Sequence, residues 1–326
     1  AFLSAIALLC IAATTATLQG VAAGWAILAM VTLFSLSRGL CSVSAKDVLG
    51  KTVSKTRRGA LMGYSAAAAG VVTLLIGSYV EIFGGRRLSA DFFMAILLAA
   101  AGIWLLAIAA FASIREEAGA TEGGGNAITA ALRSLALLKT DQALRCVVIA
   151  RALLLSVALA PPFYVLLAQQ HSGGVTGLGL MIIASGLAAS LSAPFWGRIG
   201  DRSSRRVMII ASAAAGLTGM LTFLIDRAGA TIMHSPWVYA LLFLLIAVFH
   251  GGVRLGRKVY PVDMANQDTR STYVAVSNTV IGAAMLAGGA VGMLADHFRT
   301  SAVLALLGLT SMLAALYISR MPDVSG

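Results

Sequence analysis

Gly50, Lys51 and Thr52 end the stretch AKDVLGKT and match the second half of a phosphate-binding loop, Gly-x-x-x-x-Gly-Lys-Thr/Ser. Such a loop holds the phosphates of a nucleotide with its backbone N–H groups, and its lysine reaches the terminal phosphates. The motif also requires glycine at position 45, where this chain has alanine, and a β-strand before the loop. We therefore expect no nucleotide to bind at Lys51.

Other catalytic or metal-binding arrangements are not visible in the sequence. It has four histidines, with no His-Glu-x-x-His and no Gly-x-Ser-x-Gly, and its three cysteines form no Cys-x-x-Cys pair. The sequence consequently predicts that the protein is not an enzyme and needs neither a metal ion nor a cofactor.

One charged residue stands inside a long apolar stretch: Arg151, in VIARALLLSVALAPPFYVLL. A charge within a membrane-spanning helix is costly unless it faces a cavity or a partner, so Arg151 is a candidate for binding substrate. A long side chain can also extend to the lipid headgroups, and that reading stays open. Pro161-Pro162 is expected to interrupt the same helix, and broken helices can line a substrate path. The substrate-path candidates are therefore Arg151, Tyr164 and Gln169.

The composition places these residues in a membrane protein. Of the 326 residues 59% are hydrophobic and only 11% are charged, against roughly 25% charged residues in soluble domains. The mean hydropathy is +0.90. Ten apolar stretches are long enough to cross a bilayer: 1–17, 21–43, 59–81, 91–113, 146–168, 177–196, 207–225, 237–254, 274–294 and 301–319.

The basic residues lie mostly on one side of this arrangement. Of the 24 Lys and Arg residues, only Arg86, Arg87, Arg227 and Arg299 fall in the connections of the other side. Cytoplasmic loops carry the excess of Lys and Arg, so the richer side and both ends of this chain are expected in the cytoplasm. The net charge of +11 is thus an orientation signal and does not require a nucleic-acid partner.

Two segments align at an offset of 212 residues, SRGLCSVSAKDVLGKTVSKTRRG with FHGGVRLGRKVYPVDMANQDTRS. Parallel repeats of this kind are typical of transporters. The offset predicts that about 70 to 80 residues, including two helices, are missing from the first half of the chain. Both segments are expected to be basic cytoplasmic loops between helices. Their basic residues are candidates for a cytoplasmic gate: Arg38, Lys46, Arg58, His250, Arg254, Lys258 and Arg270.

The stretch GRIGDRSSRR, residues 197–206, resembles the loop motif G-x-L-A-D-R-x-G-R-R of the major facilitator superfamily, in its copy between helices eight and nine. Glycines 197 and 200 would allow a tight turn at the membrane surface. The resemblance implies that the loop secures the cytoplasmic side and that Asp201 meets the start of the helix at Gly59. A simple topology anchor is the open alternative. The motif residues are Gly197, Gly200, Asp201, Arg202, Arg205 and Arg206.

The resemblance implies an all-α polytopic membrane protein with two helical bundles, holding ten helices (four and six) of a twelve-helix parent. The expected domains are a partial N-terminal bundle (1–113), a cytoplasmic linker (114–145) with an amphipathic helix at 127–139, and a six-helix bundle (146–326). The resemblance implies a monomeric secondary active transporter in the cytoplasmic (inner) membrane, moving a small solute by alternating access as a permease or efflux protein. The expected partners of such a transporter are its small-molecule substrate, a coupling proton and membrane lipids. The alternatives are a non-transporting receptor or lipid-handling protein on the same scaffold, or an inactive truncated transporter.

Overall fold

The computed structural model describes residues 1–52, 55–83, 90–115, 135–172, 177–200, 202–264 and 270–324. The chain forms two compact units, which we describe separately. The first comprises residues 1–65 and 85–123, and the second comprises residues 66–84 and 124–326. Residues 127–134 of the expected amphipathic helix lie outside the described residues. Residues 135–140 are described and are helical.

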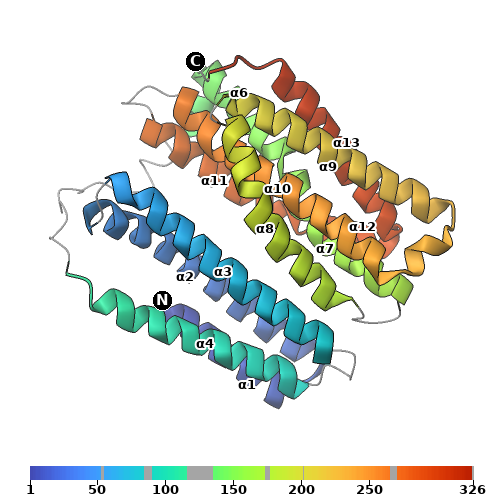
Figure 1. Cartoon of the computed structure of the whole chain (residues 1–326). Helices are drawn as coiled ribbons and strands as arrows, with labels where there is room; N and C mark the ends of the chain where they lie inside the picture. The colour runs from blue at the N-terminus through green and yellow to red at the C-terminus, as the bar shows by residue number, and fades with distance from the viewer. Residues whose placement is uncertain are drawn as a thin grey trace. The chain divides into compact units, whose positions relative to one another are not determined.

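The described residues with regular structure are helical in both units (Figure 1). The first unit holds α1 (Phe2–Thr17), α2 (Gly20–Thr52), the start of α3 (Lys55–Phe83) and α4 (Ala90–Ala112). The second unit holds the rest of α3 and the elements that follow it in the chain: α6 (Gln142–Leu153), α7 (Leu155–Ser172), α8 (Leu178–Gly200), α9 (Ser204–Arg227), η1 (Thr231–His234), α10 (Pro236–Met264), α11 (Arg270–Gly288), α12 (Val291–His297) and α13 (Thr300–Ser319).

Eight spans among the described residues are long and apolar enough to cross a membrane. They account for eight of the ten predicted segments. The other two predicted segments contain apolar helical stretches of shorter described length, Phe2–Thr15 and Ala68–Ile82. The protein is therefore an all-α polytopic membrane protein, as the sequence predicted.

Two of the predicted helices, 146–168 and 274–294, are each divided into two helices in the structure. The first of them is not divided at its prolines. Pro161 and Pro162 lie inside α7, whereas the boundary between α6 and α7 falls at Leu154. Leu154 remains in the right-handed helical region and its N–H still donates to the carbonyl of Ala150. The expectation that the prolines interrupt this helix was wrong, because spanning helices tolerate prolines within packed bundles. The segment at 274–294 divides into α11 and α12 around Gly289 and Ala290.

The stretch AKDVLGKT is helical, since α2 continues to Thr52. In the second unit α10 likewise continues through the aligned basic segment to Met264. The prediction that these residues form loops was therefore wrong, because polar residues can extend a helix beyond its apolar part. A helix in place of the loop also removes the geometry that a nucleotide would need at Lys51.

The core of the second unit is apolar, and α9 and α13 lie in close contact within it. A Cβ atom added at Gly216 would lie 2.7 Å from the carbonyl oxygen of Gly308, and one added at Gly308 would lie 2.8 Å from that of Gly216. Small residues let helices approach this closely in a membrane. In the same core, Trp196 of α8 donates from Nε1 to the carbonyl of Val248 in α10 at 2.8 Å. These contacts fix the helices that carry the candidate site.

Candidate functional site

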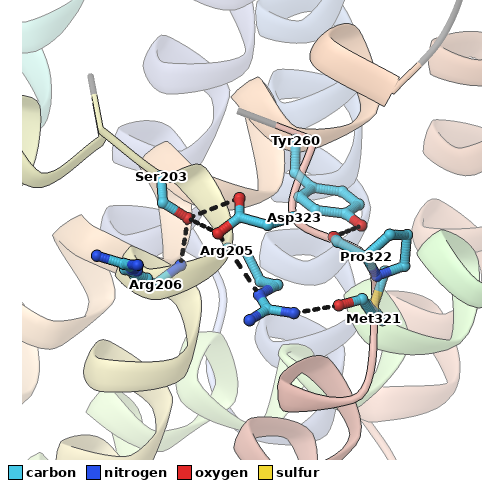
Figure 2. A network of polar contacts seen from close by, with 7 residues as sticks. All are labelled: Ser203, Arg205, Arg206, Tyr260, Met321, Pro322 and Asp323. Carbon is cyan, nitrogen blue, oxygen red and sulfur yellow. Dashed lines mark hydrogen bonds and ion pairs between the residues drawn. The ribbon is translucent and has the colours of Figure 1, made fainter. Parts of the chain in front are cut away.

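The residues around the start of α9 bind the C-terminal tail (Figure 2). Ser203 is the N-cap of α9, because its Oγ accepts a hydrogen bond from the backbone N–H of Arg206 at 3.2 Å. The hydroxyl of Ser203 also donates to the carboxylate of Asp323, with both oxygens 2.9 Å away. Ser203 therefore caps the helix and holds the tail at the same time.

Two further side chains complete this tail cluster, which we define as Ser203, Arg205, Tyr260 and Asp323. The guanidinium of Arg205 donates to the carbonyl of Met321, and its Nε lies 3.9 Å from the Asp323 carboxylate. The hydroxyl of Tyr260, near the end of α10, donates to the carbonyl of Pro322 at 2.8 Å. The tail cluster joins α9, α10 and the residues after α13 (Figure 2). We call the end of the second unit that holds this cluster the basic end.

The remaining residues of the loop motif are placed as follows. Gly197 and Gly200 lie in the last turns of α8, and neither has a positive φ. The expectation that they form a tight turn was therefore wrong. A Cβ atom at Gly200 would lie 2.8 Å from Cδ2 of Leu255, so Gly200 serves close packing of α8 on α10. Arg202 is exposed after the end of α8, and Asp201 lies outside the described residues.

Arg151 extends from α6 to α11, where it has two polar partners. Nη1 of its guanidinium donates to Oγ of Ser277, and Nη2 donates to Oδ1 of Asn278 at 2.8 Å. Arg151 stands nine residues after the first residue of α6, which is about 14 Å along the helix axis. The buried side chains of Leu144, Val148 and Val276 form an apolar cluster between the same two helices. Sequence reasoning found Arg151 but not its two neutral partners.

A second polar contact joins α6 to α11 where both helices begin. Asp141 is the N-cap of α6 and accepts from the N–H of Leu144 at 3.0 Å and from the hydroxyl of Tyr273. Burial alone would raise the pKa of Asp141, but these hydrogen bonds outweigh it and lower the pKa below its usual value of 3.8. Burial and the neighbouring carboxylate raise the pKa of Tyr273 to about 12.

The basic residues of α10 lie along one face of that helix. His250, Arg254 and Lys258 line a cavity of about 330 Å³ between α8 and α10, together with Ser192 and Trp196. Three of the predicted gate residues are thus brought to one cavity. Arg257, which is not among the predicted gate residues, belongs to the same face as His250, because positions seven residues apart on a helix nearly coincide in direction.

The other gate and path candidates do not join this cavity. Arg38 lines a separate cavity of about 630 Å³ in the first unit, among largely apolar side chains. Tyr164 is 1% exposed in the apolar core, which argues against contact with a solute, and Gln169 is exposed near the end of α7. The side chains of three further candidates lie outside the described residues: Lys46, Arg58 and Arg270.

The opposite end of the second unit contains a buried acid that the sequence reasoning missed. Asp226 was assigned to a loop, but it lies in the last turn of α9 and its side chain is 8% exposed. Its carboxylate accepts from the hydroxyl of Ser301 at 2.5 Å and lies 3.1 Å from Nε2 of His171. Helices α7, α9 and α13 therefore meet at one ionisable group. Asp226 was missed because the predicted helix ended at residue 225, one residue before this acid.

Comparison with known families gives a match over residues 152–325, just over half of the chain, to the family described as "Major Facilitator Superfamily". The match covers most of the second unit, including the tail cluster and the basic face of α10, and it begins one residue after Arg151.

Curated relatives match a little under half of the chain. "Multidrug resistance protein MdtG" of Klebsiella pneumoniae (strain 342) is 27% identical over 161 residues, which are 45% of this chain and 37% of that protein. The protein of the same name from Salmonella arizonae is 26% identical over 148 residues, 43% of this chain and 34% of the relative. The matched part of this chain thus spans little more than a third of the length of these relatives.

Proposed function

The chain belongs to the major facilitator superfamily, and on that premise we propose that the protein is a secondary transporter that moves a small solute across the cytoplasmic membrane by alternating access. The observation that carries this proposal is the cavity between α8 and α10, which places serine, tryptophan and basic side chains beside one another within membrane-spanning helices. Polar groups at membrane depth are retained where they line a path for solutes or ions.

The basic end of the second unit is the end that we propose to face the cytoplasm. It contains the tail cluster and the start of α9, where arginines 202, 205 and 206 lie. Cytoplasmic segments carry the excess of Lys and Arg in membrane proteins. In this orientation the residues 197–206 form the cytoplasmic motif of the second half, and Asp201 would contact a helix start when the protein faces outward.

The relatives named "multidrug resistance protein" make export the first direction to test for this protein. The deciding experiment is flux through the complete protein, reconstituted in liposomes of known orientation. We expect a solute gradient to drive uptake or release that protein-free liposomes do not show, and counterflow when solute is present on both sides. Saturable binding without flux in either direction would instead assign the protein to receptors on the same scaffold.

A further inference from the structure

Four basic side chains gather where α6, α10 and α11 approach the basic end. Arg151 extends from α6, and His250, Arg254 and Arg257 occupy one face of α10. The charge of Arg257 acts on both Arg151 and His250, and the charge of Arg254 acts on both Arg257 and His250. These four residues are therefore neighbours, and we call them the cationic cluster; its three arginines carry the charge.

The described side chains supply no carboxylate to this cluster. The ion pairs among them join His171 to Asp226 and Arg205 to Asp323, both outside the cluster. The two hydrogen-bond partners of Arg151 are neutral. Uncompensated cations in a membrane protein are retained where they serve a ligand or an ion pathway.

Two donors of the cluster are also unused. Nε of Arg151 and Nη1 of Arg257 are buried and have no hydrogen-bond partner in the described structure. A buried polar atom without a partner is unfavourable, and it requires an explanation. A guanidinium presents its donors as a planar fork that matches the two oxygens of a carboxylate or phosphate. The unused donors and the uncompensated charge thus call for the same chemical class of ligand.

The cavity between α8 and α10 provides room beside the cluster. His250 and Arg254 belong both to the cluster and to the cavity wall. The cavity volume of about 330 Å³ lies at the lower end of the range for small-ligand sites, about 300–1,000 Å³. The hydroxyl of Ser192 and the ring of Trp196 line the opposite wall, on α8. Among the described residues, no Asp or Glu side chain lines this cavity, so its wall favours an anion over a cation.

We propose that the cationic cluster binds the carboxylate or phosphate group of a small organic anion in the cavity between α8 and α10, and that such anions are the solutes this protein transports. The second half of this statement rests on the proposed transport function. The first half concerns binding alone and is tested separately.

The binding test uses the purified full chain in nanodiscs of phosphatidylcholine, with phenyl phosphate as the probe and benzyltrimethylammonium as a cation of similar size. We expect phenyl phosphate to raise the unfolding temperature in a saturable way and the cation to leave it unchanged. Arg151→Gln and Arg257→Gln should each weaken the apparent affinity for phenyl phosphate at least ten-fold. Arg257→Lys keeps the charge but loses the planar fork of donors, so its affinity should fall between those of the unchanged protein and Arg257→Gln.

The matched control is Arg227→Gln, since Arg227 is exposed at the other end of α9. It should bind phenyl phosphate as the unchanged protein does. If Arg151→Gln does not fold, Arg257→Gln and Arg254→Gln carry the test, because Arg254 is exposed and touches the cavity. Equal affinity in the unchanged protein and in these variants, or a stronger shift with benzyltrimethylammonium, overturns the anion site.

Anionic lipid headgroups offer the same phosphate chemistry, so the measurement is repeated in nanodiscs containing phosphatidylglycerol. Retention of the phenyl phosphate shift supports a site for a soluble anion, whereas its loss assigns the cluster to lipid. Flux assays separate the two proposals. Saturable anion binding without any flux keeps the site and overturns transport, whereas flux of cations without anion binding keeps transport and overturns the site.

Discussion

The carboxylate of Asp226 lies 3.1 Å from Nε2 of His171, so that the last turn of α9 is joined to the end of α7. Nδ1 of the same histidine lies 3.1 Å from the carbonyl oxygen of Leu167. Both ring nitrogens of His171 thus lie within hydrogen-bond distance of an oxygen atom. The rings of His234 and Tyr239 lie beside it, with centroids 5.8 and 6.2 Å away. Together with Ser301 of α13, the His171–Asp226 pair joins three helices at the end opposite the tail cluster.

Replacing Asp226 by asparagine removes the charge of this pair while it preserves the size of the side chain. We expect the free energy of unfolding to fall by about 1–3 kcal/mol, because the hydrogen bonds from His171 and Ser301 lose a charged acceptor in a nearly buried place. Thermal unfolding of the purified protein in detergent measures the change. Arg227→Gln, at the exposed neighbouring residue, should have little effect, and an equal loss in both variants would contradict the pairing.

The Ser203–Asp323 contact predicts a coupling between the start of α9 and the tail. Ser203→Ala should cost about 1 kcal/mol as a lost N-cap, and more because the Asp323 carboxylate also loses its donor. A double-mutant cycle with Asp323→Ala, read by thermal unfolding, isolates the second contribution. Strict additivity of the two changes would show that the tail is not held by this serine.

The contact between Gly216 and Gly308 predicts a steric limit in the core. An added Cβ atom at Gly216 would lie 2.5 Å from Cγ of Met312 as well as 2.7 Å from the Gly308 carbonyl oxygen. We therefore expect Gly216→Ala to lower the free energy of unfolding by about 1–3 kcal/mol, as overpacking does. Gly282→Ala is the control, because nothing lies within 4 Å of its added Cβ. It should be neutral or stabilise the protein by up to about 1 kcal/mol.

The fold could be predicted from the sequence because membrane-spanning helices need long apolar stretches, and these stretches are visible without knowledge of tertiary contacts. The ends of the helices were harder to predict. The basic residues after Arg38 and after Arg254 continue α2 and α10 as helix, although hydropathy alone placed them in loops. The same limit hid Asp226, which lies just past the predicted end of its helix.

Only part of the candidate site could be predicted, because a charge within an apolar helix is visible in the local sequence whereas its distant partners are not. Arg151 was found because a charge within an apolar helix is costly and therefore conspicuous. Its partners Ser277 and Asn278 carry no charge and lie 126 and 127 residues away. The Ser203–Asp323 contact spans 120 residues. Such pairs cannot be predicted from a local sequence pattern, because the contacts form only when the helices pack together.

The contact between Asp141 and Tyr273 predicts a pH window for the α6–α11 interface. The pKa of Asp141 is lower in the folded protein than its usual value of 3.8, so its contribution to stability is complete above about pH 4 and is lost as the pH falls through the folded pKa. The pKa of Tyr273 is raised to about 12, so its contribution is complete below its usual value of about 10 and is lost as the pH rises toward 12.

Asp141→Asn tests the acidic limit of this window, because asparagine still caps a helix but carries no charge. The difference in unfolding temperature between the unchanged protein and this variant should be constant from about pH 5 to 9 and should shrink below about pH 4. Tyr273→Phe removes the donor and should give the same constant difference near neutral pH, with a decline above about pH 10. Gln142→Ala, at the exposed next residue, should show a difference that does not change with pH. A difference for Asp141→Asn that grows as the pH falls would mean that the acid is protonated more readily in the folded protein, and that the hydroxyl of Tyr273 does not stabilise its charged form.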